Sequence, residues 1–216
     1  GAYGLGVYNL AAEISAMPST ELIAPLNRAV YPAYAQLAKV RDKLLARFLE
    51  VYGLITLISF PVAFGLFCLS DLVVALLLGP QWVDAVPILQ ILGLCGLLGA
   101  LQGNMYIFMS AMGKPKANTM LSASLLAVSL PAVIWASLQY GALGAAYAHF
   151  ASAILGFAGI VFVFTLVTGT TKRALVSVMW RPLLSSLMMA SILQARFLFV
   201  DDSPLPNQPV VRLLLL

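Results

Sequence analysis

The stretch KVRDKLLARFLEVYGLITLISFPVAFGLFCL, residues 39–69, joins a basic segment to a long apolar one. Its first nine residues carry four Lys or Arg side chains, and the next 22, residues 48–69, carry a single charged side chain, Glu50. A helix needs about 20 mostly apolar residues to cross the hydrocarbon core of a bilayer. The stretch therefore predicts a transmembrane helix that begins next to a basic loop.

The same alternation of apolar and polar segments continues along the chain. Six apolar segments near or above that length are expected to span the membrane: residues 5–37, 48–69, 85–112, 119–138, 143–167 and 183–200. Arg212, followed by the leucines at 213–216, indicates the start of a further span. We predict an all-α, polytopic membrane helical bundle. We interpret residues 1–216 as a fragment of one transmembrane lobe, with the N-terminal half of the same chain missing.

The basic residues occur in every second gap between the spans. The gaps after the first, third and fifth spans hold nine of the 12 Lys and Arg: Lys39, Arg41, Lys43, Arg47, Lys114, Lys116, Lys172, Arg173 and Arg181. The other gaps, residues 70–84, 139–142 and 201–209, hold none, and the first and last of these contain aspartates. By the positive-inside rule, the first set of gaps is cytoplasmic and the second is external.

The composition excludes several classes of protein. With 62% hydrophobic and 9% charged residues and a mean hydropathy of +0.97, the chain has too little polar surface for a soluble globule. Its net charge of +4 is divided among short loops and forms no basic stripe for nucleic acid. Cys68 and Cys95 lie in or beside apolar spans, where packing is favoured over a disulfide. The sequence predicts no cofactor, metal site or nucleic-acid partner.

The first span is unusual in its length and composition. It runs about 33 residues and contains Pro18, Pro25 and Pro32 at seven-residue intervals. Each proline removes a backbone donor and clashes with the preceding turn. Three prolines on nearly one face therefore favour a bent or broken helix that flexes or lines a cavity.

Arg28, within this span, is the leading candidate for ligand binding. It lies about 15 Å, at helical rise, from the basic gap that begins at Lys39. A guanidinium at such depth usually faces a polar cavity, and its geometry suits phosphate. Snorkelling to the cytoplasmic surface is the alternative if the helix ends near Tyr31 instead of Leu37. We favour the anion-binding interpretation.

Three other ionisable residues lie within the predicted spans. Glu13 and Glu21 are either ion-coupling sites for protons or sodium or neutral partners in the bundle, and the sequence leaves both open. His149 is a lesser candidate: a buried histidine satisfied by a neighbouring helix is favoured over a proton relay. No catalytic constellation or phosphate-binding glycine loop is present, so the sequence does not predict an enzyme.

Five short segments carry a family resemblance. They are LGVY at 5–8, RAVYPAY at 28–34, GPQWVDAVPILQ at 79–90, GKP at 113–115 and GALGAA at 141–146. Together they resemble the polysaccharide (oligosaccharide) flippase family of the multidrug/oligosaccharidyl-lipid/polysaccharide exporter superfamily. The first span is similar to the stretch that opens the second half of these transporters. The match covers most of the chain up to about Val167.

The resemblance implies a multi-pass transporter of the bacterial inner (cytoplasmic) membrane, with two helical lobes, of which this chain forms much of the C-terminal one. Such proteins flip a polyprenyl-pyrophosphate-linked oligosaccharide outward by alternating access, for exopolysaccharide or lipopolysaccharide O-antigen assembly. Arg28 would meet the pyrophosphate. The implied partners are the lipid-linked oligosaccharide, membrane lipids and the missing half of the chain.

Three alternative functions remain open. A multidrug or cation antiporter of the same superfamily would depend more on Glu13 and Glu21 than on Arg28, and drug efflux would distinguish it. An integral membrane enzyme of envelope glycan assembly, such as a glycan polymerase, needs sizeable external loops. The external gaps here, of at most about 15 residues, argue against it. A structural membrane scaffold is compatible with everything except the charged first span.

Overall fold

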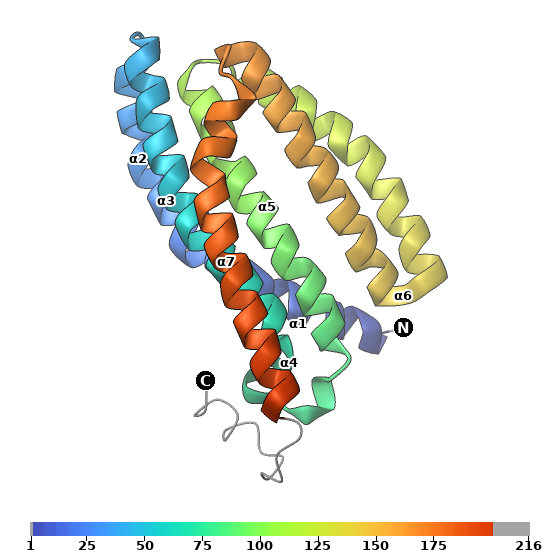
Figure 1. The fold of residues 1–216 in the computed structure, drawn as a ribbon. Coiled ribbons are helices and arrows are strands. Elements are labelled where there is room, and N and C mark those ends of the chain that lie inside the picture. The colour runs from blue at the N-terminus through green and yellow to red at the C-terminus, as the bar shows by residue number, and fades with distance from the viewer. Residues whose placement is uncertain (1, 201–216) are drawn as a thin grey trace.

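The computed structural model describes residues 2–200, with side chains described for residues 2–195. Every element in this part is helical, which confirms the predicted all-α class (Figure 1). The elements are α1 (Ala2–Pro18), the π-helix η1 (Ser19–Ile23), α2 (Ala24–Leu37), α3 (Arg41–Cys68), α4 (Ser70–Leu77), the 3-10 helix η2 (Pro80–Trp82), α5 (Ala85–Ala111), α6 (Pro115–Thr168) and α7 (Lys172–Val200). Asp201, Asp202 and the predicted start of a further span lie outside the described residues.

Helix α6 is longer than a single crossing requires. Its 54 residues would extend about 80 Å as a straight helix, against a hydrocarbon core of about 30 Å. The run is interrupted at Gly141, whose φ of 65° and ψ of −147° are not helical, and Figure 1 shows α6 doubling back on itself. The element therefore contains the two predicted spans 119–138 and 143–167, with the turn in the predicted gap.

Four of the helices are long and apolar enough to cross a membrane, namely α3, α5, α6 and α7. The first predicted span, residues 5–37, is divided into α1, η1 and α2, and each of these pieces is too short to qualify alone. The chain is thus an all-helical membrane protein with further helices beyond these four. The count of six crossings plus the start of another stays a prediction.

Several helices extend beyond the predicted spans, because hydropathy reports the apolar part of a helix and not its ends. α7 begins at Lys172 and not at residue 183, and α3 begins at Arg41 and not at residue 48. Most basic side chains of these two gaps therefore lie on helices. A helix that continues into the headgroup layer keeps its backbone hydrogen bonds, so charged residues do not end it. The predicted external gap 70–84 is likewise largely helical, as α4 and η2.

Two apolar clusters hold the helices together. In the first, the rings of Tyr34, Phe48, Phe108 and Phe164 meet, and the Phe48 centroid lies 4.7 Å from that of Phe164 and 4.8 Å from that of Phe108. The second cluster joins α1, α5 and the second half of α6 through small and branched side chains. Because lipid tails are as apolar as these side chains, close packing is what stabilises the contacts. Both clusters fix the broken first segment against α5.

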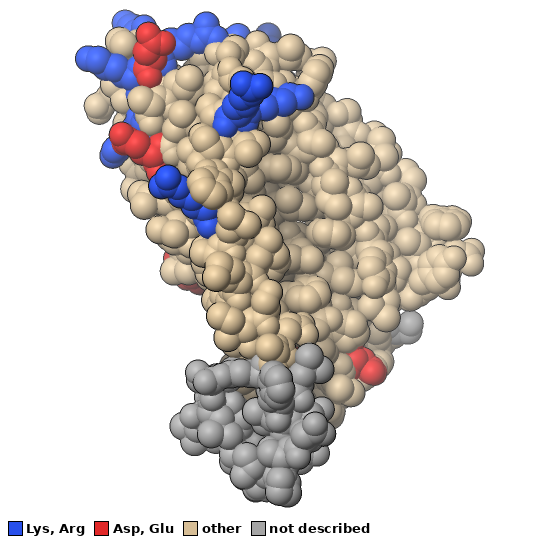
Figure 2. Space-filling view, viewed as in Figure 1, with Lys and Arg blue, Asp and Glu red and all other residues tan. Residues whose placement is uncertain are grey.

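Charged side chains are distributed unequally between the two ends of the bundle. Figure 2 shows Lys and Arg gathered toward the end where α2 turns into α3, and a broad uncharged surface along the rest of this face. The opposite end carries Asp71 on α4 and Asp84 just before α5. This distribution supports the assignment of the α2–α3 end to the cytoplasmic side.

Candidate functional site

The first segment is a helix broken at its middle, as its prolines predict. α1 ends at Pro18, a π-helical turn follows over Ser19–Ile23, and α2 then carries Pro25 in its first turn. Pro18 has no N–H to donate, so the regular ladder cannot pass through it, and a π-turn absorbs the change in register. The backbone N–H of Ala24 donates to the Ser19 carbonyl to close this turn. The expected bent or broken helix is confirmed.

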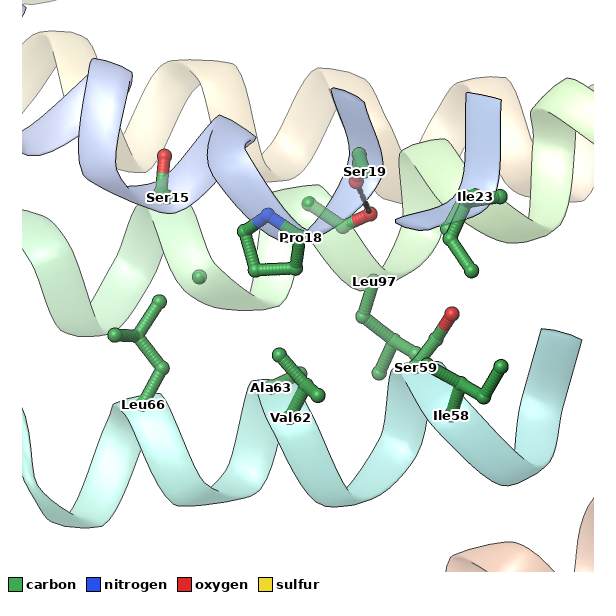
Figure 3. A pocket seen from close by; sticks show the side chains of 13 residues that line it. Ser15, Pro18, Ser19, Ile23, Ile58, Ser59, Val62, Ala63, Leu66 and Leu97 are labelled. Carbon is green, nitrogen blue, oxygen red and sulfur yellow. Dashed lines mark hydrogen bonds between the residues drawn. The ribbon is translucent and has the colours of Figure 1, made fainter. Parts of the chain in front are cut away.

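The π-turn is seated closely on α5. The Ser19 hydroxyl donates to the Gly96 carbonyl at 3.3 Å, and a Cβ at Gly96 would lie only 3.0 Å from the Ser15 carbonyl oxygen. Beside it is a cavity of about 20 Å³, enough for one water molecule, which Figure 3 shows between the turn and α3. The buried hydroxyl of Ser59 faces this cavity without a protein partner. Irregular backbone is thus placed against protein, where a membrane tolerates it.

The side of this broken helix that faces away from the bundle is polar. Its exposed polar residues are Asn9, Glu13, Thr20, Glu21, Arg28 and Gln36, alongside apolar residues such as Met17 and Leu22. The first half of α6 differs, because its outward side chains are apolar: Met120 is 74% exposed and Leu138 is 79% exposed. A surface in contact with lipid tails excludes ionised groups unless they reach water. The outer face of the first half of α6 therefore suits contact with lipid tails, and the outer face of the first segment suits contact with water or protein.

Arg28 lies exposed on this polar side. Its Nε donates to the Ala24 carbonyl at 3.4 Å, and among the described side chains the one ion pair joins Arg47 and Glu50, leaving the Arg28 guanidinium uncompensated. α2 continues to Leu37 and does not end near Tyr31, but a helix can extend past the hydrocarbon layer, so the snorkelling alternative stays open. The guanidinium has donors available for an anion. Its role in binding stays a prediction.

Glu13 and Glu21 share the exposed polar side with Arg28. Glu13 lies on α1 and Glu21 within the π-turn, so the break separates Glu13 from Arg28 along the segment. Neither carboxylate pairs with a cation among the described side chains. The structure brings the three charged residues onto one outer side of the bundle without joining them into a cluster.

A buried polar network behind Arg28 was missed by sequence analysis. The Asn104 amide donates to Asn27 Oδ1 at 2.8 Å, and the Tyr34 hydroxyl donates to Asn104 Oδ1 at 3.4 Å. All three side chains are buried, and Asn27 directly precedes Arg28. The network fixes the rotation of α2 against α5 and so directs Arg28 outward. Amides inside apolar spans would have been the signal, because each needs a partner there.

Removal of this network should weaken the packing of α2 against α5. Asn104→Ala leaves Asn27 and Tyr34 without their partner, and we expect a loss of about 1 kcal/mol in the free energy of unfolding, as for interhelical hydrogen bonds in other membrane proteins. Unfolding of the intact protein in mixed micelles measures this loss in free energy. Gln139→Ala, at the exposed turn of α6, is the matched control and should change little. Equal losses for the two variants would contradict the proposed positioning role.

The expectation of a buried, hydrogen-bonded His149 is wrong. The side chain is exposed and lines a groove of about 520 Å³ between α5 and α6, together with Cys95, Gln102 and Ser152. The second half of α6 packs through the buried small residues at 144–146, and this rotation turns His149 toward the groove. The groove does not include Arg28, so His149 and the polar side of the first segment are separate features.

Cys68 and Cys95 are both free. Within residues 2–200, no group of three or more His, Cys, Asp or Glu side chains could hold a metal ion.

Comparison with known proteins shows similarity to proteins of polysaccharide biosynthesis. Residues 1–87 match the family model described as "Polysaccharide biosynthesis protein". The chain is 26% identical over 188 residues to the lipopolysaccharide biosynthesis protein WzxC of Escherichia coli K12, covering 87% of this chain and 38% of WzxC. It is 34% identical over 101 residues to the teichuronic acid biosynthesis protein TuaB of Bacillus subtilis, covering 47% of this chain and 21% of TuaB. The chain is thus similar over part of its length to proteins of polysaccharide biosynthesis.

A solved structure has the same fold as this chain. The inward closed conformation of the lipid II flippase MurJ superposes with a TM-score of 0.75 and 14% identity, covering 98% of this chain and 44% of MurJ. At this identity the likeness concerns the fold. The chain spans less than half the length of the curated relatives it matches.

Proposed function

We propose that the intact protein moves a polyprenyl-pyrophosphate-linked oligosaccharide from the cytoplasmic to the external leaflet of the bacterial inner membrane by alternating access. The product would serve exopolysaccharide or O-antigen assembly. The observation that carries this proposal is the polar outer side of α1, η1 and α2, with Arg28 unpaired among the described side chains. The family resemblance gives the substrate class.

A substrate with a charged head group needs a polar side of this kind. A pyrophosphate bearing a sugar chain cannot enter hydrocarbon without losing hydration worth many kcal/mol, so it needs a wet path with a compensating cation. We place this path between the lobe described here and the remainder of the intact protein, with Arg28 facing it. The pyrophosphate would accept hydrogen bonds from the guanidinium, while an apolar outer face such as that of α6 meets lipid.

The break in the first segment suits a helix that changes its bend during transport. A helix interrupted by a π-turn and three prolines can change its bend without losing a full set of backbone hydrogen bonds. We infer that α1 and α2 change their mutual angle as the path opens to one side and then the other. Glu13 and Glu21, on either side of Pro18, are the candidate sites for a driving proton or sodium ion.

A multidrug or cation antiporter is the second candidate function. It is favoured by the exposure of Glu13 and Glu21 on the same side as Arg28, because carboxylates rather than a guanidinium would bind organic cations. Resistance to cationic drugs conferred by the intact gene would support this candidate. Loss of glycan export without a change in drug resistance would support the flippase.

Deletion of the intact gene tests the proposal directly. We expect surface glycan to be lost and lipid-linked oligosaccharide to accumulate, protected from a membrane-impermeant glycosidase or lectin added outside the inner membrane. Plasmid-borne wild-type gene should restore both measures. Accumulated intermediate that is accessible from outside would instead place the defect in a later polymerisation or transfer step, and normal glycan export would refute the assignment.

A further inference from the structure

The cytoplasmic half of the bundle also has an open groove between α3 and α7. It has a volume of about 700 Å³ and is lined by Glu50, Leu54 and Leu57 from α3 and by Trp180, Arg181 and Pro182 from α7, among others. Figure 2 shows acidic and basic side chains together on this upper part of the molecule. The groove is separate from the polar side of α1, η1 and α2, whose residues do not line it.

The groove holds one cation and one anion that do not pair with each other. The Arg181 guanidinium carbon lies 5.4 Å from the centre of its neighbour's ring, that of Trp180. The Glu50 carboxylate accepts from Arg47 at 2.8 Å, but both side chains of that pair are more than half exposed, and such pairs are weak. Both charges therefore remain available to a ligand that enters the groove.

The remainder of the groove and its surroundings are apolar. Leu54 and Leu57 are each more than half exposed there, and the neighbouring outer side of α7 presents Val176, Leu184 and Met188. This outer surface resembles that of α6 and suits contact with lipid tails. The groove thus opens toward the bilayer, unlike the side that carries Arg28.

The two charges lie below the inner headgroup layer, on the cytoplasmic part of their helices. α3 has 28 residues and extends about 42 Å, close to the full thickness of a bilayer with its headgroups. Glu50 lies nine residues from the start of α3, and Arg181 lies nine residues from the start of α7, about 14 Å along each helix. Their long side chains can reach the phosphate level from that depth, and Trp180 is the residue type favoured at this interface.

We propose that this groove binds a zwitterionic phospholipid of the cytoplasmic leaflet that carries a primary amine. Its phosphate contacts Arg181, its ammonium contacts Glu50, and one acyl chain lies along Leu54 and Leu57. Opposite charges that line one groove complement the opposite charges of such a headgroup. A purely anionic headgroup meets repulsion from Glu50, and a quaternary ammonium cannot donate a hydrogen bond to it.

The test uses the intact protein in detergent, with phosphatidylethanolamine or phosphatidylglycerol added at defined ratios and retained lipid counted by native mass spectrometry. Glu50→Gln and Arg181→Gln should each weaken phosphatidylethanolamine retention at least fivefold. Glu50→Gln should leave phosphatidylglycerol retention equal or higher, because it removes a repulsive charge. Asp42→Asn and Arg173→Gln are matched controls, exposed on the same helices outside the groove, and should remain within twofold of wild type.

Three outcomes would overturn the proposal. They are unchanged phosphatidylethanolamine retention in both groove variants, equal losses in the control variants, and tighter retention of phosphatidylglycerol than of phosphatidylethanolamine by the wild type. Thermal melting of each variant identifies misfolded protein, and Trp180→Phe, which keeps an aromatic ring, gives a second binding measurement. Arg28→Gln should retain lipid normally, so failure of the flippase assignment and failure of this inference are distinguishable.

Discussion

Replacement of Arg28 with Gln in the intact protein should abolish glycan export while leaving the protein in the membrane at normal levels. A hydrogen bond to a charged group contributes about 1.5–3 kcal/mol, so its loss should lower the affinity for the pyrophosphate about 10-fold or more. Arg28→Lys keeps the charge but loses the two parallel hydrogen bonds of a guanidinium, so we expect partial export. Surface glycan per cell, normalised to the amount of protein in isolated membranes, measures both variants.

The control for this prediction is a cation at the cytoplasmic end of the bundle. Lys116 is exposed at the start of α6, and Lys116→Gln should leave export within about twofold of wild type, because exposed charges in water contribute little. Export by Arg28→Gln at the level of this control would remove Arg28 from the mechanism. A defect in Glu13→Gln and Glu21→Gln together with normal export in Arg28→Gln would favour the antiporter.

Gly144→Ala should destabilise the α6 hairpin more than any other glycine substitution in a described helix. A Cβ at this position would clash with the Ala136 carbonyl oxygen and lie 2.7 Å from Tyr140 Cβ, two residues that precede the turn at Gly141, whereas Gly144 follows it. A backbone oxygen cannot move aside as a flexible side chain can, so the two halves of α6 must separate. We expect a loss of about 1–3 kcal/mol in the free energy of unfolding, the usual cost of overpacking.

The comparison that isolates this effect is Gly99→Ala. Gly99 lies inside α5, and a Cβ there would meet nothing within 4 Å, so this substitution should be neutral or slightly stabilising. Unfolding of both variants in mixed micelles, with cysteine cross-linking across the hairpin as a second measurement, tests the difference. Identical stabilities for the two variants would show that the hairpin does not pack as described.

Much of the architecture was predictable from the apolar pattern. The bilayer requires long apolar helices, and the basic residues between them mark one side, so spans 48–69, 85–112 and the pair within α6 were placed correctly in outline. The start of α7 at Lys172 was not predicted. Helix ends in the headgroup layer are set by backbone hydrogen bonding, which hydropathy does not report.

Only the features of the candidate site that depend on neighbouring residues in the sequence were predictable. Pro18 removes one backbone donor, so a bend or break in this segment was foreseen from a few residues, although Pro32, Pro61 and Pro131 lie inside helices that continue. The contact of Asn27 with Asn104 joins residues 77 positions apart, and the orientation of His149 depends on which side of α6 packs against α5. Neither could be deduced from neighbouring residues along the chain.

The sequence by itself determined that this protein is a membrane-embedded helical bundle, that its first segment is broken and that charge lies on that segment, because hydropathy, proline geometry and ionisation are properties of residues. The tertiary structure alone decided which side of each helix faces outward. That choice turns Arg28, Glu13 and Glu21 away from the bundle, buries Asn27 behind them and opens separate grooves beside α5 and α3. Helix rotation depends on the fit between surfaces distant in the chain, and for that reason packing, not composition, sets the site.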